Sequence, residues 1–188
     1  MNFISVLLIG VGLSMDAFAA AICKGLAIKK NFLEKSLVIA LFFGVFQGLM
    51  PLIGYQLGSI FAEKLQAMDH WIAFVLLGLI GLNMIREARD KTCPVEEDRL
   101  DIKNLFMLAI ATSIDALAVG VSFAFLKIRI SLAVLVIGLT TFIISFAGVQ
   151  IGKFFGIALK DKAQVAGGVI LILLETKILV EHLGLLTL

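Results

Sequence analysis

Two aspartates lie within otherwise apolar stretches, in matching sequence contexts. Asp16 lies in the segment Ser-Met-Asp-Ala-Phe-Ala, and Asp115 lies in Ser-Ile-Asp-Ala-Leu-Ala, 99 residues further along the chain. A charged side chain at the centre of a bilayer costs about 2.5–3.5 kcal/mol even on insertion-based scales. Two such residues in repeated contexts indicate a function that needs negative charge inside a membrane, and the simplest such function is binding a cation.

These residue types suit a hard divalent cation. Two neighbouring carboxylates repel each other, so either one holds a proton or both bind a divalent ion. Carboxylates, carbonyls and water are the ligands of Mn²⁺, Mg²⁺ and Ca²⁺, and Thr112, one helical turn before Asp115, is a further candidate ligand. The alternative is that each aspartate caps a helix break or bonds to a neighbouring helix.

Two further residues are candidate ligands. Pro51 has no N–H to donate to the carbonyl four residues earlier, which belongs to Gln47. Gln47 therefore offers a side-chain oxygen and a main-chain oxygen, although an ordinary proline kink with an inward-facing glutamine is an equal alternative. Glu175 lies in the middle of the last apolar segment, two residues from Lys177. It is either a proton-coupling carboxylate or the partner of a cation elsewhere.

The composition predicts an all-α polytopic membrane protein. The chain has 188 residues, of which 61% are hydrophobic and 16% charged, with a mean hydropathy of +1.08. Soluble domains carry about 25% charged residues. A net charge of +2 does not suggest nucleic-acid binding. A structural disulfide is not expected, because Cys23 and Cys93 are far apart in the sequence and no Cys-x-x-Cys motif occurs.

Six segments are candidate membrane spans, each compared with the length of about 20 residues that a span needs. They are 3–22, 36–60, 71–85, 104–126, 130–151 and 163–186, the third being short. The first contains Asp16 and follows no basic region, so we interpret it as a retained span and not a signal peptide. Three Gly-x-x-x-Gly motifs predict close helix packing; they begin at Gly44, Gly54 and Gly148.

Basic residues predict the orientation. The loops after the first, third and fifth segments contain 12 basic residues, namely Lys24, Lys29, Lys30, Lys35, Arg86, Arg89, Lys91, Arg99, Lys103, Lys153, Lys160 and Lys162. The loops after the second and fourth contain 3, namely Lys64, Lys127 and Arg129. By the positive-inside rule the first set is cytoplasmic and both termini face outward. Loop 86–103 is then a solvated cytoplasmic linker, with a metal-sensing role for its acidic run as the alternative.

The two halves of the chain resemble each other beyond the aspartate motif. Gly54, Gln56 and Gly58 align with Gly148, Gln150 and Gly152 at an offset of 94 residues. We predict two three-helix repeats, 1–85 and 104–188, joined by the linker 86–103. Three spans per repeat is an odd number, so the repeats are inverted, which is typical of transporters with a binding site near the membrane midplane. An ancient duplication without this function is the alternative.

At the same offset Gln47 aligns with Thr141 and Pro51 aligns with Ser145. The two copies therefore differ at these positions, and a symmetric site is not supported.

The chain resembles the MntP-type manganese efflux pumps over essentially its whole length. The resemblance rests on the two Ser-x-Asp-Ala segments, on Phe-Gly-x-x-Gln-x-x-x-Pro-Leu-Ile-Gly at 43–54, on His-Trp-Ile-Ala-Phe at 70–74 and on the Gly pair at 167–168. It implies an exporter of Mn²⁺ in the bacterial inner membrane, within the lysine-exporter superfamily, in which the aspartates matching Asp16 and Asp115 are needed for transport. Gln47 falls where some relatives carry an acid, and Glu175 and Lys177 replace a less polar stretch.

We therefore expect a transporter and not an enzyme, with Mn²⁺ as substrate, no cofactor, protons as counter-ion and the lipid bilayer as surroundings. An exporter of another divalent cation or of an amino acid is the alternative within transport. An amino-acid exporter needs a pocket for a zwitterion, and Lys177 is the only basic residue at the centre of a segment. An intramembrane aspartyl protease is a rival from another class, but the sequence has no Gly-x-Gly-Asp motif.

Overall fold

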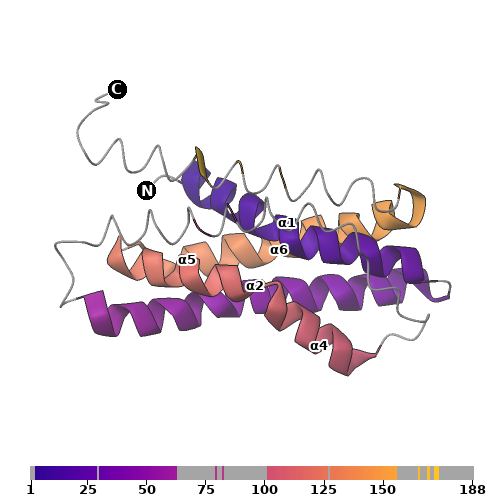
Figure 1. Cartoon of the computed structure of the whole chain (residues 1–188), viewed down its shortest axis with the longest axis horizontal. Helices are drawn as coiled ribbons and strands as arrows, with labels where there is room; N and C mark the ends of the chain where they lie inside the picture. Colours follow the sequence, from indigo (N-terminus) through magenta and orange to yellow (C-terminus); the bar gives the residue numbers. More distant parts are fainter. Residues whose placement is uncertain are drawn as a thin grey trace.

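The computed structural model of the chain describes residues 3–28, 30–62, 79, 82, 101–126, 128–155, 165, 169, 172 and 173. In this part the structure is helical, without strands (Figure 1). Its helices are α1 (Phe3–Ala27), α2 (Phe32–Ala62), α4 (Ile102–Ala111), α5 (Ile114–Phe125) and α6 (Ile130–Phe155). Among the described residues, four stretches are long and apolar enough to cross a membrane, namely Ile4–Ala27, Phe32–Ile60, Ile102–Phe125 and Ile130–Phe154. They match the first, second, fourth and fifth predicted spans, whereas most of 71–85 and 163–186 lies outside the described residues.

A short connection reverses the chain between α1 and α2. Asn31 has φ 50°, a left-handed conformation that asparagine tolerates better than most residues. Its carbonyl accepts a 3.0 Å hydrogen bond from the amide of Lys35, the first bond of α2. The two helices therefore run in opposite directions, although they make few contacts with each other.

Among the described helices, those from different halves of the chain make most of the contacts. α1 packs along α6, and α2 packs along both α5 and α6. Glycines allow this approach: a Cβ on Gly54 would overlap the carbonyl oxygen of Leu117, and a Cβ on Gly148 would lie 3.1 Å from that of Phe18. Gly44 and Gly138 face each other, with a Cβ on Gly44 only 2.9 Å from the Gly138 carbonyl. The close packing predicted from the Gly-x-x-x-Gly motifs is confirmed.

The predicted span 104–126 is not one continuous helix. α4 ends at Ala111, α5 begins at Ile114, and the two are joined at an angle (Figure 1). The Ser113 hydroxyl donates to the carbonyls of Ala109 at 2.7 Å and Ile110 at 3.1 Å. Serine and threonine side chains that bind nearby carbonyls compete with the helical main-chain bonds. The predicted span is therefore present as Ile102–Phe125, and the helix within it is interrupted at Thr112 and Ser113.

Cys23, near the end of α1, is disulfide-bonded. The prediction that no structural disulfide occurs was therefore wrong. It rested on the wide separation of the two cysteines in the sequence and on the absence of a Cys-x-x-Cys motif, neither of which fixes the distance between side chains in the fold.

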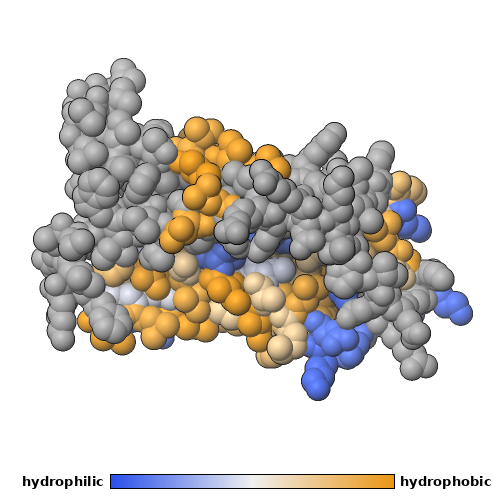
Figure 2. Space-filling view, in the orientation of Figure 1, coloured by the Kyte–Doolittle hydropathy of each residue, from blue (hydrophilic) through white to orange (hydrophobic). Residues whose placement is uncertain are grey.

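The surface is apolar along the helices and charged at one end. On α2 every fourth residue from Leu33 to Leu57 is an exposed apolar side chain, as expected of a face toward lipid. The ends of α1 and α6 and the starts of α2 and α4 lie together, and hydrophilic residues gather at that end in Figure 2. There the Lys153 ammonium lies 4.6 Å from the ring centroid of Phe32, a cation–π contact that joins α6 to α2.

Two apolar clusters form the core of the part of the chain that the structure describes. The first contains Val6, Ile9, Leu13, Ala116, Val119, Phe123, Ala133, Val136 and Ile137, with Met15, Met50, Tyr55, Ile128 and Ile130 packed against it. The second contains Ala17, Ala21, Ile28, Ile39, Phe43, Leu105, Ala109 and Val149, with Ala20, Phe32, Val38, Phe42, Phe46 and Leu108 against it. Every long described helix contributes to at least one cluster, and α1, α2 and α6 contribute to both.

Candidate metal site

A set of polar residues lies between the two apolar clusters. On α1 the boundary falls between Leu13 and Ala17, and on α2 between Phe46 and Met50. On the broken helix it falls between Ala109 and Ala116, and on α6 between Ile137 and Val149. We call the polar residues in these intervals the polar layer: Ser14, Asp16, Gln47, Thr112, Ser113, Asp115, Thr140, Thr141 and Ser145. Both aspartates of the repeated motif thus lie at the same depth of the bundle, as do Gln47 and Thr112.

Asp16 lies in the interior of α1 and is half-buried. Its Oδ1 atom is inaccessible to solvent. Ser14, two residues earlier, is fully buried and donates to the carbonyl of Val11 at 2.8 Å, so its hydroxyl is occupied within its own helix. The carboxylate of Asp16 is therefore the charged group that α1 brings to the layer.

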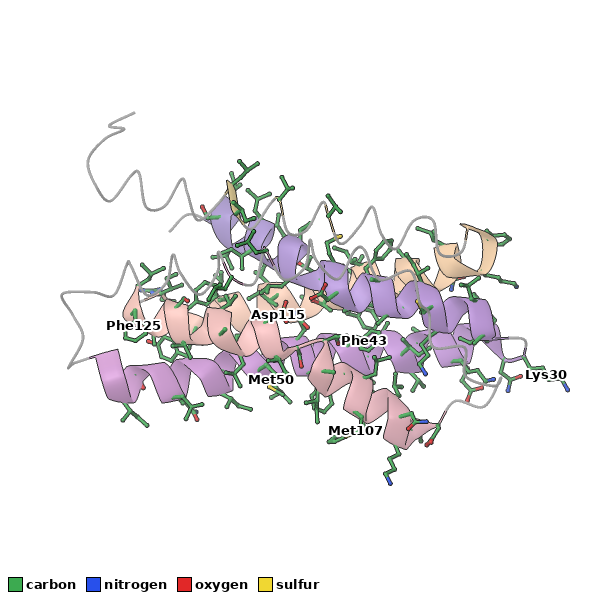
Figure 3. The ribbon with its side chains drawn as sticks, viewed as in Figure 1. Lys30, Phe43, Met50, Met107, Asp115 and Phe125 are labelled. Atoms are coloured by element: carbon green, nitrogen blue, oxygen red, sulfur yellow. The ribbon has the colours of Figure 1, made fainter. Side chains whose placement is uncertain are left out.

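Asp115 lies in the first turn of α5, just beyond the helix break near the middle of the bundle (Figure 3). Its Oδ1 accepts a 2.8 Å hydrogen bond from the amide of Ala116, and its Oδ2 is buried. The N-terminus of a helix carries a partial positive charge that stabilises a carboxylate. Asp115 therefore lies next to a helix break whose N-cap residue is Ser113, whereas Asp16 is in a continuous helix.

Gln47 is fully buried and connects α2 to α1. Its Nε2 donates a 3.1 Å hydrogen bond to the carbonyl of Leu13, three residues before Asp16. This bond orients the amide and leaves Oε1 buried without a hydrogen bond within the described helices. An unpaired buried acceptor is costly, so an oxygen held in this way is suited to receiving a ligand.

Thr112 is the remaining candidate ligand from the sequence that lies within the described residues. Its hydroxyl donates to the carbonyl of Ala109 at 3.3 Å, which leaves the lone pairs of its oxygen available to a cation. Glu175 lies outside the described residues. Among the residues that the structure describes, no group of three or more His, Cys, Asp or Glu side chains could hold a metal, so neutral oxygens are needed to complete a coordination shell around the two carboxylates.

Comparison with known proteins identifies the family. Residues 30–179 match the family model Mntp, described as "Putative manganese efflux pump". The chain belongs to this family. A protein of Desulfitobacterium hafniense named "Putative manganese efflux pump MntP" is 56% identical over 99% of this chain and 98% of the relative. Proteins with the same name from Acetivibrio thermocellus and Bifidobacterium adolescentis are 53% identical over 100% of this chain and 95% of the relative, and 52% identical over 97% and 98%. No solved structure matches the chain.

Two further residues, Thr141 and Ser145, are candidates for the site that the sequence did not single out. Both are fully buried on α6, within the polar layer, and neither hydroxyl has a hydrogen-bond partner in the described structure. The sequence placed them opposite Gln47 and Pro51 in the repeat alignment, but only as a sign that the copies differ. The sequence feature that could have identified them is the presence of two hydroxyl residues one helical turn apart in an apolar span.

Proposed function

We propose that the chain exports Mn²⁺ from the cytoplasm across the bacterial inner membrane, and that the polar layer is its ion-binding site. The names of the relatives support the ion and the direction of transport. The observation that carries the site is the common depth of Asp16, Gln47 and Asp115, between two apolar clusters. A cation at this depth is shielded from bulk water on both sides, as a transported ion must be.

The layer supplies oxygen ligands of the kind that Mn²⁺ prefers. The carboxylates of Asp16 and Asp115 offset the ion's charge, and the Oε1 of Gln47 adds a neutral ligand that is already oriented by the bond to Leu13. Thr112 contributes its hydroxyl oxygen. Without an ion, two carboxylates in an apolar setting favour holding a proton, so binding Mn²⁺ would release protons and release of Mn²⁺ would take them up. Proton exchange is therefore part of the proposed cycle, with Glu175 as a sequence-based candidate for coupling.

We further propose that the six spans form two inverted repeats, 1–85 and 104–188, joined by the cytoplasmic linker 86–103. The close contacts between helices support this arrangement. Gly54 approaches Leu117, and Gly148 approaches Phe18. The repeat alignment relates Gly54 to Gly148, at an offset of 94 residues, and Phe18 to Leu117, at an offset of 99 residues. Each of these contacts is therefore the repeat counterpart of the other. Gly44 and Gly138 are equivalent positions of the two repeats, and they contact each other.

The apolar clusters support the same relation. Val6 of the first cluster corresponds to Leu105 of the second, and Ile137 of the first corresponds to Phe43 of the second. Inverted repeats of this kind accommodate alternating access by rocking around a site near the midplane. The end where α1 finishes and α2 starts carries Lys24, Lys30 and Lys35, so it is the proposed cytoplasmic side and both termini face outward.

Total cell manganese tests the proposed function. A manganese-sensitive bacterial strain would express the chain or its Asp16→Asn variant, and the metal content would be measured by elemental analysis. We expect lower manganese with the wild-type chain alone. Equal manganese in both strains, with equal amounts of protein in the membrane, would exclude the assignment of manganese export through this carboxylate.

A further inference from the structure

The buried hydroxyl groups of the described helices fall into two classes. Ser14, Ser36, Ser113 and Ser122 each donate to a carbonyl three or four residues earlier, at distances from 2.6 to 3.2 Å. This is the usual way in which a hydroxyl is satisfied inside a helix. Thr141 and Ser145 are equally buried, at 0% exposure, but neither makes such a bond or any other within the described structure.

Leaving two hydroxyls unsatisfied in an apolar interior is unfavourable. The usual bond to the preceding turn is sterically open to serine and threonine in any helix, and four other buried residues of this chain use it. A pair of neighbouring side chains that both forgo it indicates a ligand that occupies their oxygens during function. The two residues are four apart, so they lie on one face of α6.

That face is directed into the bundle. On the side of α6 toward α1, Ile137 lies against Gly10 and Gly148 lies against Phe18; on the side toward α2, Gly138 and Phe142 lie against Gly44. At 3.6 residues per turn, Thr141 and Ser145 fall between these two contact faces. The hydroxyls are thus placed between α1 and α2.

Their depth matches that of the proposed ion site. Gly10 and Phe18 bracket Asp16 on α1, and the residues that they contact, Ile137 and Gly148, bracket Thr141 and Ser145 on α6. α2 brings Gln47 to the same layer from the other side. Hydroxyl oxygens are neutral hard ligands, which complement two carboxylates without adding further repulsion.

We propose that Thr141 and Ser145 bind the transported divalent cation through their hydroxyl oxygens, so that α6 forms part of the ion path. This inference rests on the proposed ion site in the polar layer. It also gives the two repeats different roles, because the position that carries an amide at Gln47 carries a hydroxyl at Thr141. The ion would pass between an amide-containing and a hydroxyl-containing half of the layer.

The test is Mn²⁺ transport by the purified full chain in liposomes that contain a manganese-quenched dye. Thr141→Val and Ser145→Ala, singly and together, remove the hydroxyls with little change in volume. We expect the KM for Mn²⁺ of the double variant to be about tenfold higher or more, because two ligands of the ion are lost. Thr141→Ser retains the oxygen and is expected to remain within about twofold of the wild type.

Ser122→Ala is the matched control, because it removes a buried hydroxyl that is satisfied within its own helix. The proposal is overturned if the double variant keeps the wild-type KM, or if Ser122→Ala raises the KM equally. If the double variant does not fold, the two single variants and Thr141→Ser decide in the same way. Loss of transport in Asp16→Asn with an unchanged double variant would retain the proposed function and reject only the role of α6. Absence of Mn²⁺ transport by the wild type would reject both.

Discussion

The side-chain amide of Gln47 donates a 3.1 Å hydrogen bond to the main-chain carbonyl of Leu13, and so joins α2 to α1 one turn before Asp16. α1 and α2 otherwise make few contacts. This bond fixes the orientation of the amide and directs the remaining oxygen into the polar layer. The connection between the two first helices is therefore made by the same residue that we propose as a neutral ligand.

Replacing Gln47 is expected to affect both roles. Gln47→Leu removes the bond to Leu13 and the free oxygen, so we expect lower Mn²⁺ export and a loss of about 1 kcal/mol in stability. Gln47→Glu keeps an oxygen at the site and should retain more export than Gln47→Leu. Gln56→Leu, at an exposed position of the same helix, is the control. Equal export by Gln47→Leu and the control would contradict the role of the amide.

The motif aspartates are expected to be essential individually. Asp16→Asn and Asp115→Asn remove charge at the layer with almost no change in shape, and each should reduce export by more than about tenfold, which corresponds to at least ~1.4 kcal/mol. Elemental analysis of cells provides the measurement. Glu34→Gln removes an exposed acid in the first turn of α2 and should leave export unchanged. Export at the wild-type rate by either aspartate variant would rule out the proposed site.

The glycine contacts predict a position-dependent response to alanine. In Gly54→Ala the new Cβ would overlap the Leu117 carbonyl, which is main chain and has little freedom to move. We expect a loss of about 1–3 kcal/mol in stability, read as a lower melting temperature of the purified protein. Gly10→Ala is the control, because its Cβ would lie 3.4 Å from the nearest atom, the Cα of Ile137. Equal melting temperatures for the two variants would show that helices α2 and α5 separate more easily than we infer.

The break between α4 and α5 is expected to depend on Ser113. Ser113→Ala removes the hydroxyl that binds the carbonyls of Ala109 and Ile110, and alanine favours a continuous helix. Amide hydrogen exchange should become slower at residues 112–114, and export should fall because Asp115 would lose its place at a helix start. Ser122→Ala, further along α5, should change neither quantity. Faster or unchanged exchange at the break would mean that packing alone maintains it.

Labelling of single introduced cysteines in intact cells tests the orientation of the chain in the membrane. We expect a membrane-impermeant maleimide to react with Ser131→Cys, at the start of α6, and with Glu34→Cys only after the cells are opened. Both positions are exposed, so access and not burial decides the result. The reverse pattern would contradict the proposed outward position of both termini.

Much of the fold followed from composition alone. The apolar segments that became α1, α2 and α6 were identifiable because a helix that crosses a membrane needs a long run without charge, whatever it packs against. The repeated aspartates and Gln47 were identifiable as candidates because polar groups are expensive at that depth. The Gly-x-x-x-Gly motifs likewise pointed to close contacts that the structure contains.

Only the tertiary structure decided how these groups are used. Hydropathy identifies 104–126 as a span, but only the structure shows that the helix within it is interrupted at Ser113, so that Asp115 lies at a helix start. Composition treats Ser122 and Ser145 alike, yet one hydroxyl is satisfied within its helix and the other is left without a partner in the described structure. A buried hydroxyl can donate to a carbonyl of its own helix or point toward a neighbouring helix. Which of the two occurs depends on the helices that pack against it. The sequence predicted negative charge inside the membrane, and the packing of α1, α2 and α6 places the neutral oxygens of Gln47, Thr141 and Ser145 in the same layer as the aspartates.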